Sequence, residues 1–194
     1  GPILMVMESV FPTSHGGGAE SQVRTLGLEF IARGVPISVV VPMVKFGPQR
    51  DIDSVEGIPV RRIRYPKLAI LGSLWMHLSL VWLLVRERDR YSVIHSHIGG
   101  NMSAVCSVIG CLLGKPVLIK LTGMTEMTGG IIDPSAGFAV RVRRRAIQLA
   151  SAYQATSHRI ARMLVAAGFD ANKVHHIPNA VDVDRFERFV GYPA

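Results

Sequence analysis

Two histidines stand two positions apart in a short apolar segment, Val93–His97, that predicts a β-strand. Alternation along a strand places the rings of His95 and His97 on one face, which would allow a metal pair. No carboxylate or third histidine follows at metal-ligand spacing, so we expect no metal here. His97 stands at the carboxyl end of the strand, where it is well placed to hydrogen-bond a polar ligand. His95 is one step inside and is expected to be a packed core residue.

A glycine-rich loop follows the first apolar segment, Ile3–Glu8, and contains Gly16, Gly17 and Gly18 directly before a helical pattern. Consecutive glycines let backbone approach a ligand closely, and the N–H groups of a first helical turn favour an anion such as phosphate. The loop lacks the GxGxxG spacing and no Walker lysine follows, which argues against dinucleotide and P-loop sites. We interpret it as a ligand-binding loop, with a flexible glycine turn as the structural alternative.

A second candidate loop is rich in glycine and threonine and begins at Thr122 and Gly123. Its composition suits a lid or a binding pocket. The loop carries one carboxylate, Glu126, which would hold a ligand hydroxyl or act as a base. A single carboxylate on a loop is more often only solvated, and this alternative stays open.

Short β-rich apolar segments alternate with longer helical patterns along the whole chain. This alternation predicts an α/β, Rossmann-like fold with a parallel sheet of about seven strands and helices on both faces. In such sheets ligands bind beyond the carboxyl ends of the strands. The expected strands are Ile3–Glu8, Pro36–Val41, Val60–Tyr65, Val93–Ser96, Val117–Leu121, Ala152–Thr156 and Val174–Ile177. The expected helices are Ala19–Arg33, Leu68–Arg88, Asn101–Leu113, Phe138–Ala150 and His158–Ala167, with Gly34, Gly114 and Gly168 as stops.

The chain has 194 residues, of which 48% are hydrophobic and 19% charged. These values fit one globular domain with a sizeable core. Cys106 and Cys111 match neither a zinc nor a disulfide spacing, so both are expected to be core thiols in a reducing compartment. No charged-then-apolar leader precedes the first strand, and we expect a cytoplasmic protein.

The formal net charge of +8 suits an anionic partner. Basic residues flank the uncharged stretch Leu68–Val85 on both sides, and a further cluster occupies residues 141–145. None is interleaved with aromatic residues for base stacking, so no nucleic acid is expected. The stretch reaches the lower length of a membrane span, but a span would divide the sheet, which favours a buried or interfacial helix. Solvated helix ends and an anionic membrane surface are the two interpretations of the basic clusters.

Taken in order, several segments resemble the N-terminal domain of glycosyltransferase family four, the retaining GT-B enzymes that use nucleotide sugars. The segments are Phe11–Glu20, Leu28–Gly34, Ile37–Val41, Val93–His97, Gly114–Gly123, Ala155–Gly168 and Val174–Asp182. The chain departs from the family pattern in having Ser92 for the usual aspartate, Ala180 for the usual glycine, and no histidine after Thr122.

The resemblance implies an N-terminal, acceptor-side domain over residues 1–186, the start of an interdomain linker at 187–194, and a C-terminal nucleotide-sugar-binding domain outside this chain. It implies transfer of a sugar, with retention of configuration, from a nucleotide-sugar donor to a saccharide or lipid-linked acceptor in polysaccharide biosynthesis. It implies no metal or other cofactor. The chain alone is expected to be inactive, because the family's donor-holding residues, including a paired-glutamate motif, lie in the second domain.

The resemblance also assigns roles to residues of this chain. His97 would contact the transferred sugar as the catalytic residue. The donor- or acceptor-binding residues would be Gly16, Gly17, Gly18, Thr122, Gly123, Glu126, Ser157 and Asn179. Two other classes of function stay open: a different GT-B sugar enzyme, such as an epimerase or phosphorylase, and a non-enzymatic Rossmann-like binding module.

Overall fold

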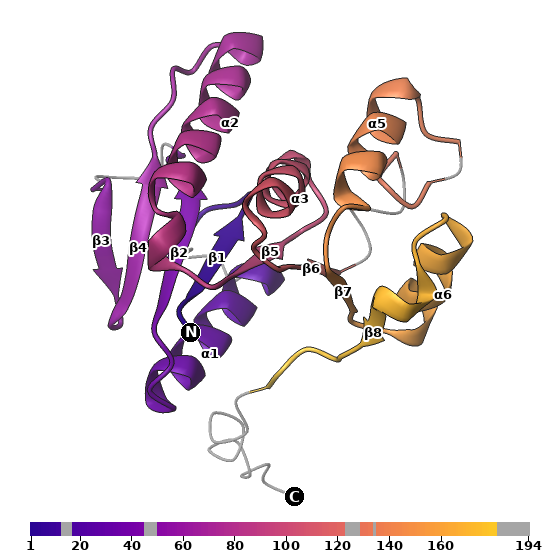
Figure 1. Cartoon of the computed structure of the whole chain (residues 1–194). Helices are drawn as coiled ribbons and strands as arrows, with labels where there is room; N and C mark the ends of the chain where they lie inside the picture. The colour runs from indigo at the N-terminus through magenta and orange to yellow at the C-terminus, as the bar shows by residue number, and fades with distance from the viewer. Residues whose placement is uncertain (13–16, 45–49, 123–128, 134, 182–194) are drawn as a thin grey trace, which may run out of the picture.

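The fold is built on one eight-stranded sheet, which a computed structural model describes over residues 1–12, 17–44, 50–122, 129–133 and 135–181. The strand order is β3-β4-β2-β1-β5-β6-β7-β8, and all neighbours are parallel except β3 and β4. Figure 1 shows the sheet with helices packed on it. The strands are β1 Ile3–Met7, β2 Ile37–Pro42, β3 Ile52–Val55, β4 Ile58–Ile63, β5 Val93–His97, β6 Val117–Leu121, β7 Ala152–Ala155 and β8 Val174–His176.

The seven expected strands are all present, and β3 is an eighth that the sequence did not predict. It forms a hairpin with β4 through Glu56 and Gly57, which both have positive φ, 53° and 85°. A two-residue turn of this kind matches the natural twist of paired strands. Three of the four residues of β3 are exposed, so it has no buried face and no apolar alternation to reveal it.

The expected helices are confirmed, with ends that differ by up to three residues. They are α1 Gly18–Ala32, α2 Ala69–Arg86, α3 Asn101–Leu113, α5 Phe138–Ile147 and α6 His158–Ala166, with short 3-10 turns η1 Arg88–Arg90 and η2 Ala171–Lys173. The three predicted glycine stops follow their helices with left-handed backbone: Gly34 at φ 69°, Gly114 at φ 65° and Gly168 at φ 87°.

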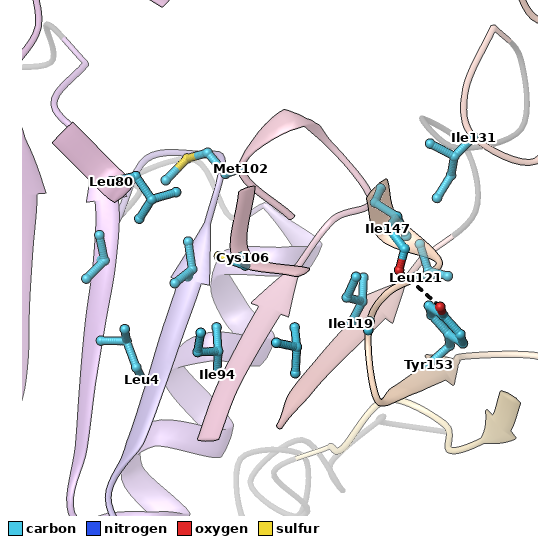
Figure 2. Close-up of a cluster of buried hydrophobic side chains, with 14 of the residues drawn as sticks. Leu4, Leu80, Ile94, Met102, Cys106, Ile119, Leu121, Ile131, Ile147 and Tyr153 are labelled. Carbon is cyan, nitrogen blue, oxygen red and sulfur yellow. Dashed lines mark hydrogen bonds between the residues drawn. The ribbon is translucent and has the colours of Figure 1, made fainter. Parts of the chain in front are cut away.

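Two cores lie on opposite faces of the sheet because successive strand residues point to opposite sides. In β1, Leu4 and Val6 face one core, and Met5 and Met7 face the other. The first core is covered by α2, α3, α5 and α6, and the second by α1. Figure 2 shows the first core, where the Tyr153 hydroxyl donates to a backbone carbonyl of α5.

The two cysteines differ in their surroundings. Cys106 is fully buried in the first core, as expected, but Cys111 is exposed, so its assignment as a core thiol is wrong. Five helical residues rotate a side chain by roughly 140° around the axis, which turns Cys111 of α3 away from the sheet.

The sheet has a topological switch point between β1 and β5. From β1 the chain winds outward through β2 to β4, and from β5 it winds the other way through β6 and β7 to β8. Ligands of open α/β sheets bind beyond the carboxyl ends of the strands at such a point. The fold therefore directs attention to the ends of β1 and β5, where Glu8 and His97 lie.

Candidate functional site

Three polar side chains form a row across the carboxyl ends of neighbouring strands, on the face covered by α1. His97 of β5 is in register with Lys120 of β6, which is in register with Gln154 of β7. On its other side His97 is in register with Met7 of β1. All three polar side chains are buried. We call His97, Lys120 and Gln154 the polar row, and it ends at the switch point.

His97 has hydrogen-bonding capacity that the described part of the chain does not use. Its side chain is 1% exposed, and neither ring nitrogen has a hydrogen-bond partner among the described residues. Burial lowers the pKa of His97 well below its usual value, and the neighbouring His95 and Lys120 lower it further. The ring is therefore neutral at pH 7, with one donor and one acceptor nitrogen.

His95 occupies the packed position that was expected for it. It is in register with Met5 of β1 and Leu118 of β6, one step inside the sheet edge. Burial, with a smaller effect of Lys120, lowers the pKa of His95 to about 4. Its Nε2 has no hydrogen-bond partner in the described residues, so it is buried but not fully satisfied.

Lys120 is a buried cation that the sequence prediction of the site missed. Its side chain is 1% exposed, and Nζ donates to Oε1 of Gln22 on α1 at 3.2 Å. Burial lowers the pKa of Lys120 to about 8. The available signal was a lysine inside the apolar strand β6, because buried lysines are rare unless they are paired.

Gln22 also fixes the chain that leaves the last strand. Its Nε2 donates to the carbonyl of Ala180 at 2.7 Å, and its Oε1 accepts from the Ala180 N–H at 3.1 Å. Gln154 donates to the carbonyl of Ile177 at 3.0 Å. Residues 177–180 are thus held against α1 and the polar row, beside a hollow of about 320 Å³.

The start of α1 is occupied by a carboxylate of its own first turn. Gly17 is the N-cap and Gly18 the first helical residue. Glu20 accepts a hydrogen bond from the Ser9 hydroxyl, and a Cβ at Gly17 would lie 1.8 Å from Oε2 of Glu20. A side chain at position 17 would therefore displace the Glu20 carboxylate from this place. A phosphate at this helix N-terminus would have to bind beside Glu20 or displace it.

The start of α3, across the switch point, is capped by Glu8, the residue that follows β1. Oε2 of Glu8 accepts from the backbone N–H of Met102 at 3.0 Å. A Cβ at Gly100 would lie 2.2 Å from the same oxygen. Neither Glu8 nor Glu20 was predicted as a site residue; Glu8 caps α3 from far away in the sequence, so no local spacing reveals that contact.

The other predicted site residues lie along the same sheet edge where the structure describes them. Thr122 follows β6 and is exposed, and Asn179 is exposed beside Ala180. The hydroxyl of Ser157 caps α6 by accepting from the N–H of Ile160 at 3.3 Å. Gly16, Gly123 and Glu126 lie outside the described residues. Within the described ranges, no group of three or more histidine, cysteine, aspartate or glutamate side chains is placed to hold a metal ion.

Comparison with known sequences identifies a family. Residues 16–185 match the sequence profile of Glycosyltransferase Family 4. The match includes α1, the whole sheet except β1, and the polar row. No curated protein sequence matches the chain.

Solved structures share the fold at low sequence identity. Anabaena HepE, in complex with UDP and glucose, superposes with a TM-score of 0.62 at 20% identity, over 94% of this chain and 45% of its own. Sucrose-phosphate synthase from Thermosynechococcus elongatus superposes with a TM-score of 0.64 at 16% identity, over 94% of this chain and 49% of its own. UDP-N-acetylglucosamine 2-epimerase from Rickettsia bellii superposes with a TM-score of 0.62 at 11% identity, over 96% of this chain and 47% of its own. The chain thus spans about half the length of these structures and has the fold of the N-terminal half of a GT-B enzyme.

Proposed function

The chain belongs to glycosyltransferase family 4, and we propose that it is the acceptor-side domain of an enzyme that transfers a sugar from a nucleotide to a saccharide or lipid-linked acceptor. The observation that carries this proposal is the position of His97, a buried neutral imidazole at the switch point with two ring nitrogens unused by the described chain. In this proposal residues 1–186 form one domain, 187–194 begin a linker, and a second domain holds most of the donor.

We propose a UDP-sugar as the donor. The support is that the HepE structure contains UDP and glucose on a similar fold. In this arrangement Gly16, Gly17 and Gly18 border the diphosphate at the start of α1, where backbone N–H groups favour an anion. In this proposal Asn179, Ser157, Thr122, Gly123 and Glu126 bind the donor or the acceptor.

The proposed reaction retains the configuration at the sugar carbon. The bond from that carbon to the leaving phosphate oxygen breaks while the acceptor oxygen bonds on the same face, and the leaving phosphate takes the acceptor's proton. The chain positions the substrates and stabilises the charge that develops during transfer, and it supplies no nucleophile. His97 donates one hydrogen bond to the transferring sugar, and the cation of Lys120 lies in the next strand. No metal or cofactor takes part in this scheme.

An epimerase acting on nucleotide sugars is the second candidate. It is favoured by the similarity to the Rickettsia bellii enzyme, which has the same fold. The two functions differ in their products, since an epimerase returns a nucleotide sugar and a transferase releases a nucleoside diphosphate. A non-enzymatic binding module would produce neither.

The test is to incubate the protein, together with its second domain, with UDP-glucose and other UDP-sugars and a panel of saccharide and lipid-linked acceptors. We expect acceptor-dependent release of UDP and a product with the donor's anomeric configuration, measured by NMR. Interconversion of UDP-sugars without an acceptor would favour the epimerase, and no change in either assay would contradict both enzymes. We further propose a cytoplasmic location, peripheral to the membrane, with a role in polysaccharide biosynthesis.

A further inference from the structure

One face of α2 exposes large apolar side chains to solvent. Ile70 is 83% exposed, and the chain's two tryptophans, Trp75 and Trp82, are 59% and 57% exposed. Side chains three and four positions apart share one side of a helix, so these residues form a continuous stripe. We call this stripe the α2 face; its members are Leu68, Ile70, Leu71, Leu74, Trp75, Leu78, Trp82 and Val85.

The opposite side of α2 is fixed to the domain. Met76, Leu80 and Leu84 are buried in the first core, and α2 packs on α3 and β4. Gly72 lies so close to the preceding loop that a Cβ there would be 2.1 Å from the carbonyl oxygen of Pro66. Residues 69–86 are long and apolar enough to cross a membrane. Spanning would remove these residues from the core, so a helix lying along a surface is favoured.

Basic side chains border the α2 face. A groove of about 440 Å³ runs between α2 and β4, with Trp75, Leu78 and Trp82 on one side and Arg61 and Arg64 on the other. Arg61 also pairs with Glu87, and Arg64 with Asp51. The groove therefore joins an apolar wall to a basic wall.

Further cations lie at both ends of the helix. The Arg86 guanidinium lies 4.7 Å from the ring centroid of Trp82, and Lys67 Nζ lies 3.9 Å from that of Tyr65. Residues 61–90 carry seven arginines and lysines against two carboxylates, and Asp51 and Asp53 pair with two of these arginines, which leaves an excess of three positive charges. The arginines of α5 have a different setting, because Arg144 donates to two backbone carbonyls of the domain itself.

We propose that the α2 face binds the surface of an anionic membrane, with α2 parallel to the bilayer plane. Tryptophan and leucine enter the boundary between headgroups and acyl chains, and the flanking arginines and lysine contact lipid phosphates. The excess of positive charge favours an anionic membrane over a second copy of this chain. A second copy of the α2 face would bring two basic surfaces together, whereas anionic lipid complements both the apolar and the basic wall of the groove. The proposal does not depend on sugar transfer.

The chain has two tryptophans, Trp75 and Trp82, and both belong to the α2 face. Tryptophan fluorescence therefore reports on this face alone. The chain is titrated with vesicles of phosphatidylcholine alone and with vesicles that also contain phosphatidylglycerol. We expect a blue shift of tryptophan emission and co-sedimentation only with the anionic vesicles, both weakened by salt. Inorganic phosphate at matched ionic strength should produce no blue shift, which separates a lipid surface from a site for free phosphate.

The orientation is tested with single-tryptophan variants, Trp75→Phe and Trp82→Phe, and brominated lipids that quench at known depths. Seven helical residues span roughly 10 Å along the axis. A helix in the membrane plane places both tryptophans at the same depth. A depth difference of about 10 Å would indicate an inserted helix and overturn the proposed orientation.

Substitutions separate the two parts of the surface. Leu74→Ser with Leu78→Ser should abolish the blue shift, and Arg86→Gln or Arg88→Gln should each weaken binding about fivefold. The matched controls lie elsewhere: Leu112→Ser, at an exposed position of α3, and Arg33→Gln, at an exposed position after α1, should bind as the unaltered chain does. Circular dichroism checks that each variant is folded.

Several results would overturn the proposal. Equal binding to neutral and anionic vesicles would contradict the role of charge, and no binding to either would contradict membrane contact altogether. A dimer seen by analytical ultracentrifugation that Leu74→Ser with Leu78→Ser dissociates, without vesicle binding by the unaltered chain, would assign the face to a second copy.

Discussion

The rings of His95 and His97 lie 4.3 Å apart, centroid to centroid, on the α1 face of β5. They are similarly buried, yet only His97 stands in the polar row at the end of the strand. Their neighbours therefore predict different roles for two residues of the same type. We expect His97 to contact a ligand and His95 to serve in packing.

If the proposed function is correct, replacing His97 with alanine in the protein that includes the proposed second domain should lower kcat. If the neutral ring donates a hydrogen bond that strengthens in the transition state, its loss costs about 2–4 kcal/mol, as for one oxyanion-type donor. The matched variant His95→Ala should act mainly through stability and retain kcat in the folded fraction. Steady-state kinetics with circular dichroism measures both. Near-normal kcat for His97→Ala, with its loss in folded His95→Ala, would reverse the two assignments.

The burial of His95 should make the fold sensitive to mild acid. Its folded-state pKa of about 4 lies below its ordinary value of 6.5, so between these two pH values the unfolded chain binds a proton that the folded chain does not. Stability therefore falls as pH decreases through this window, by up to about 3 kcal/mol from this residue. Urea unfolding at pH 7 and pH 4.5 should show a smaller loss for His95→Leu than for the unaltered chain. An identical loss in both proteins would contradict the assignment.

The 194-residue chain alone should release no UDP from a UDP-sugar at a rate above background. The reason is that the chain spans about half of the similar GT-B structures, and in the proposed function the other half holds most of the donor. The assay is UDP release by this chain and by the protein with its second domain, at equal concentration. Comparable rates of UDP release by both proteins would contradict this prediction.

Much of the fold follows from the sequence because the buried strands and helices carry strong periodic patterns. β1 and β2 are near-continuous apolar runs, as expected for strands covered on both faces. The edge strand β3 was missed because most of it is exposed. Cys111 was misplaced because its apolar neighbours on α3 suggested burial, whereas burial depends on which way the helix turns each side chain.

The site was predicted less completely than the fold. His97 could be placed from strand alternation and its position at a strand end. The contacts of Lys120 with Gln22, and of Gln22 with Ala180, join residues that are far apart in the sequence, and no local spacing reveals them. The cap that Glu8 provides for α3 has the same character, because Glu8 and Met102 are far apart in the sequence.

The bond between Gln22 and Lys120 yields the last prediction, a coupling between two buried polar residues. Gln22→Leu should destabilise the fold by about 1–3 kcal/mol, because it leaves the buried ammonium of Lys120 without this acceptor and also frees the backbone of Ala180. Lys120→Met removes the cation that needs the acceptor. The double variant should therefore be more stable than the sum of the two single effects predicts, in a double-mutant cycle measured by urea unfolding.

The pH dependence of that coupling distinguishes a charge effect from packing. Burial lowers the pKa of Lys120 from 10.5 to about 8, so above pH 8 the folded chain holds a neutral amine while the unfolded chain still binds the proton. The penalty for the buried charge is full below pH 8 and is relieved as pH rises from 8 to 10.5. The coupling energy should accordingly shrink between pH 7 and pH 9.5. A coupling that is constant over this range would mean that Gln22 contributes through shape and its bonds to Ala180, and not through the charge of Lys120.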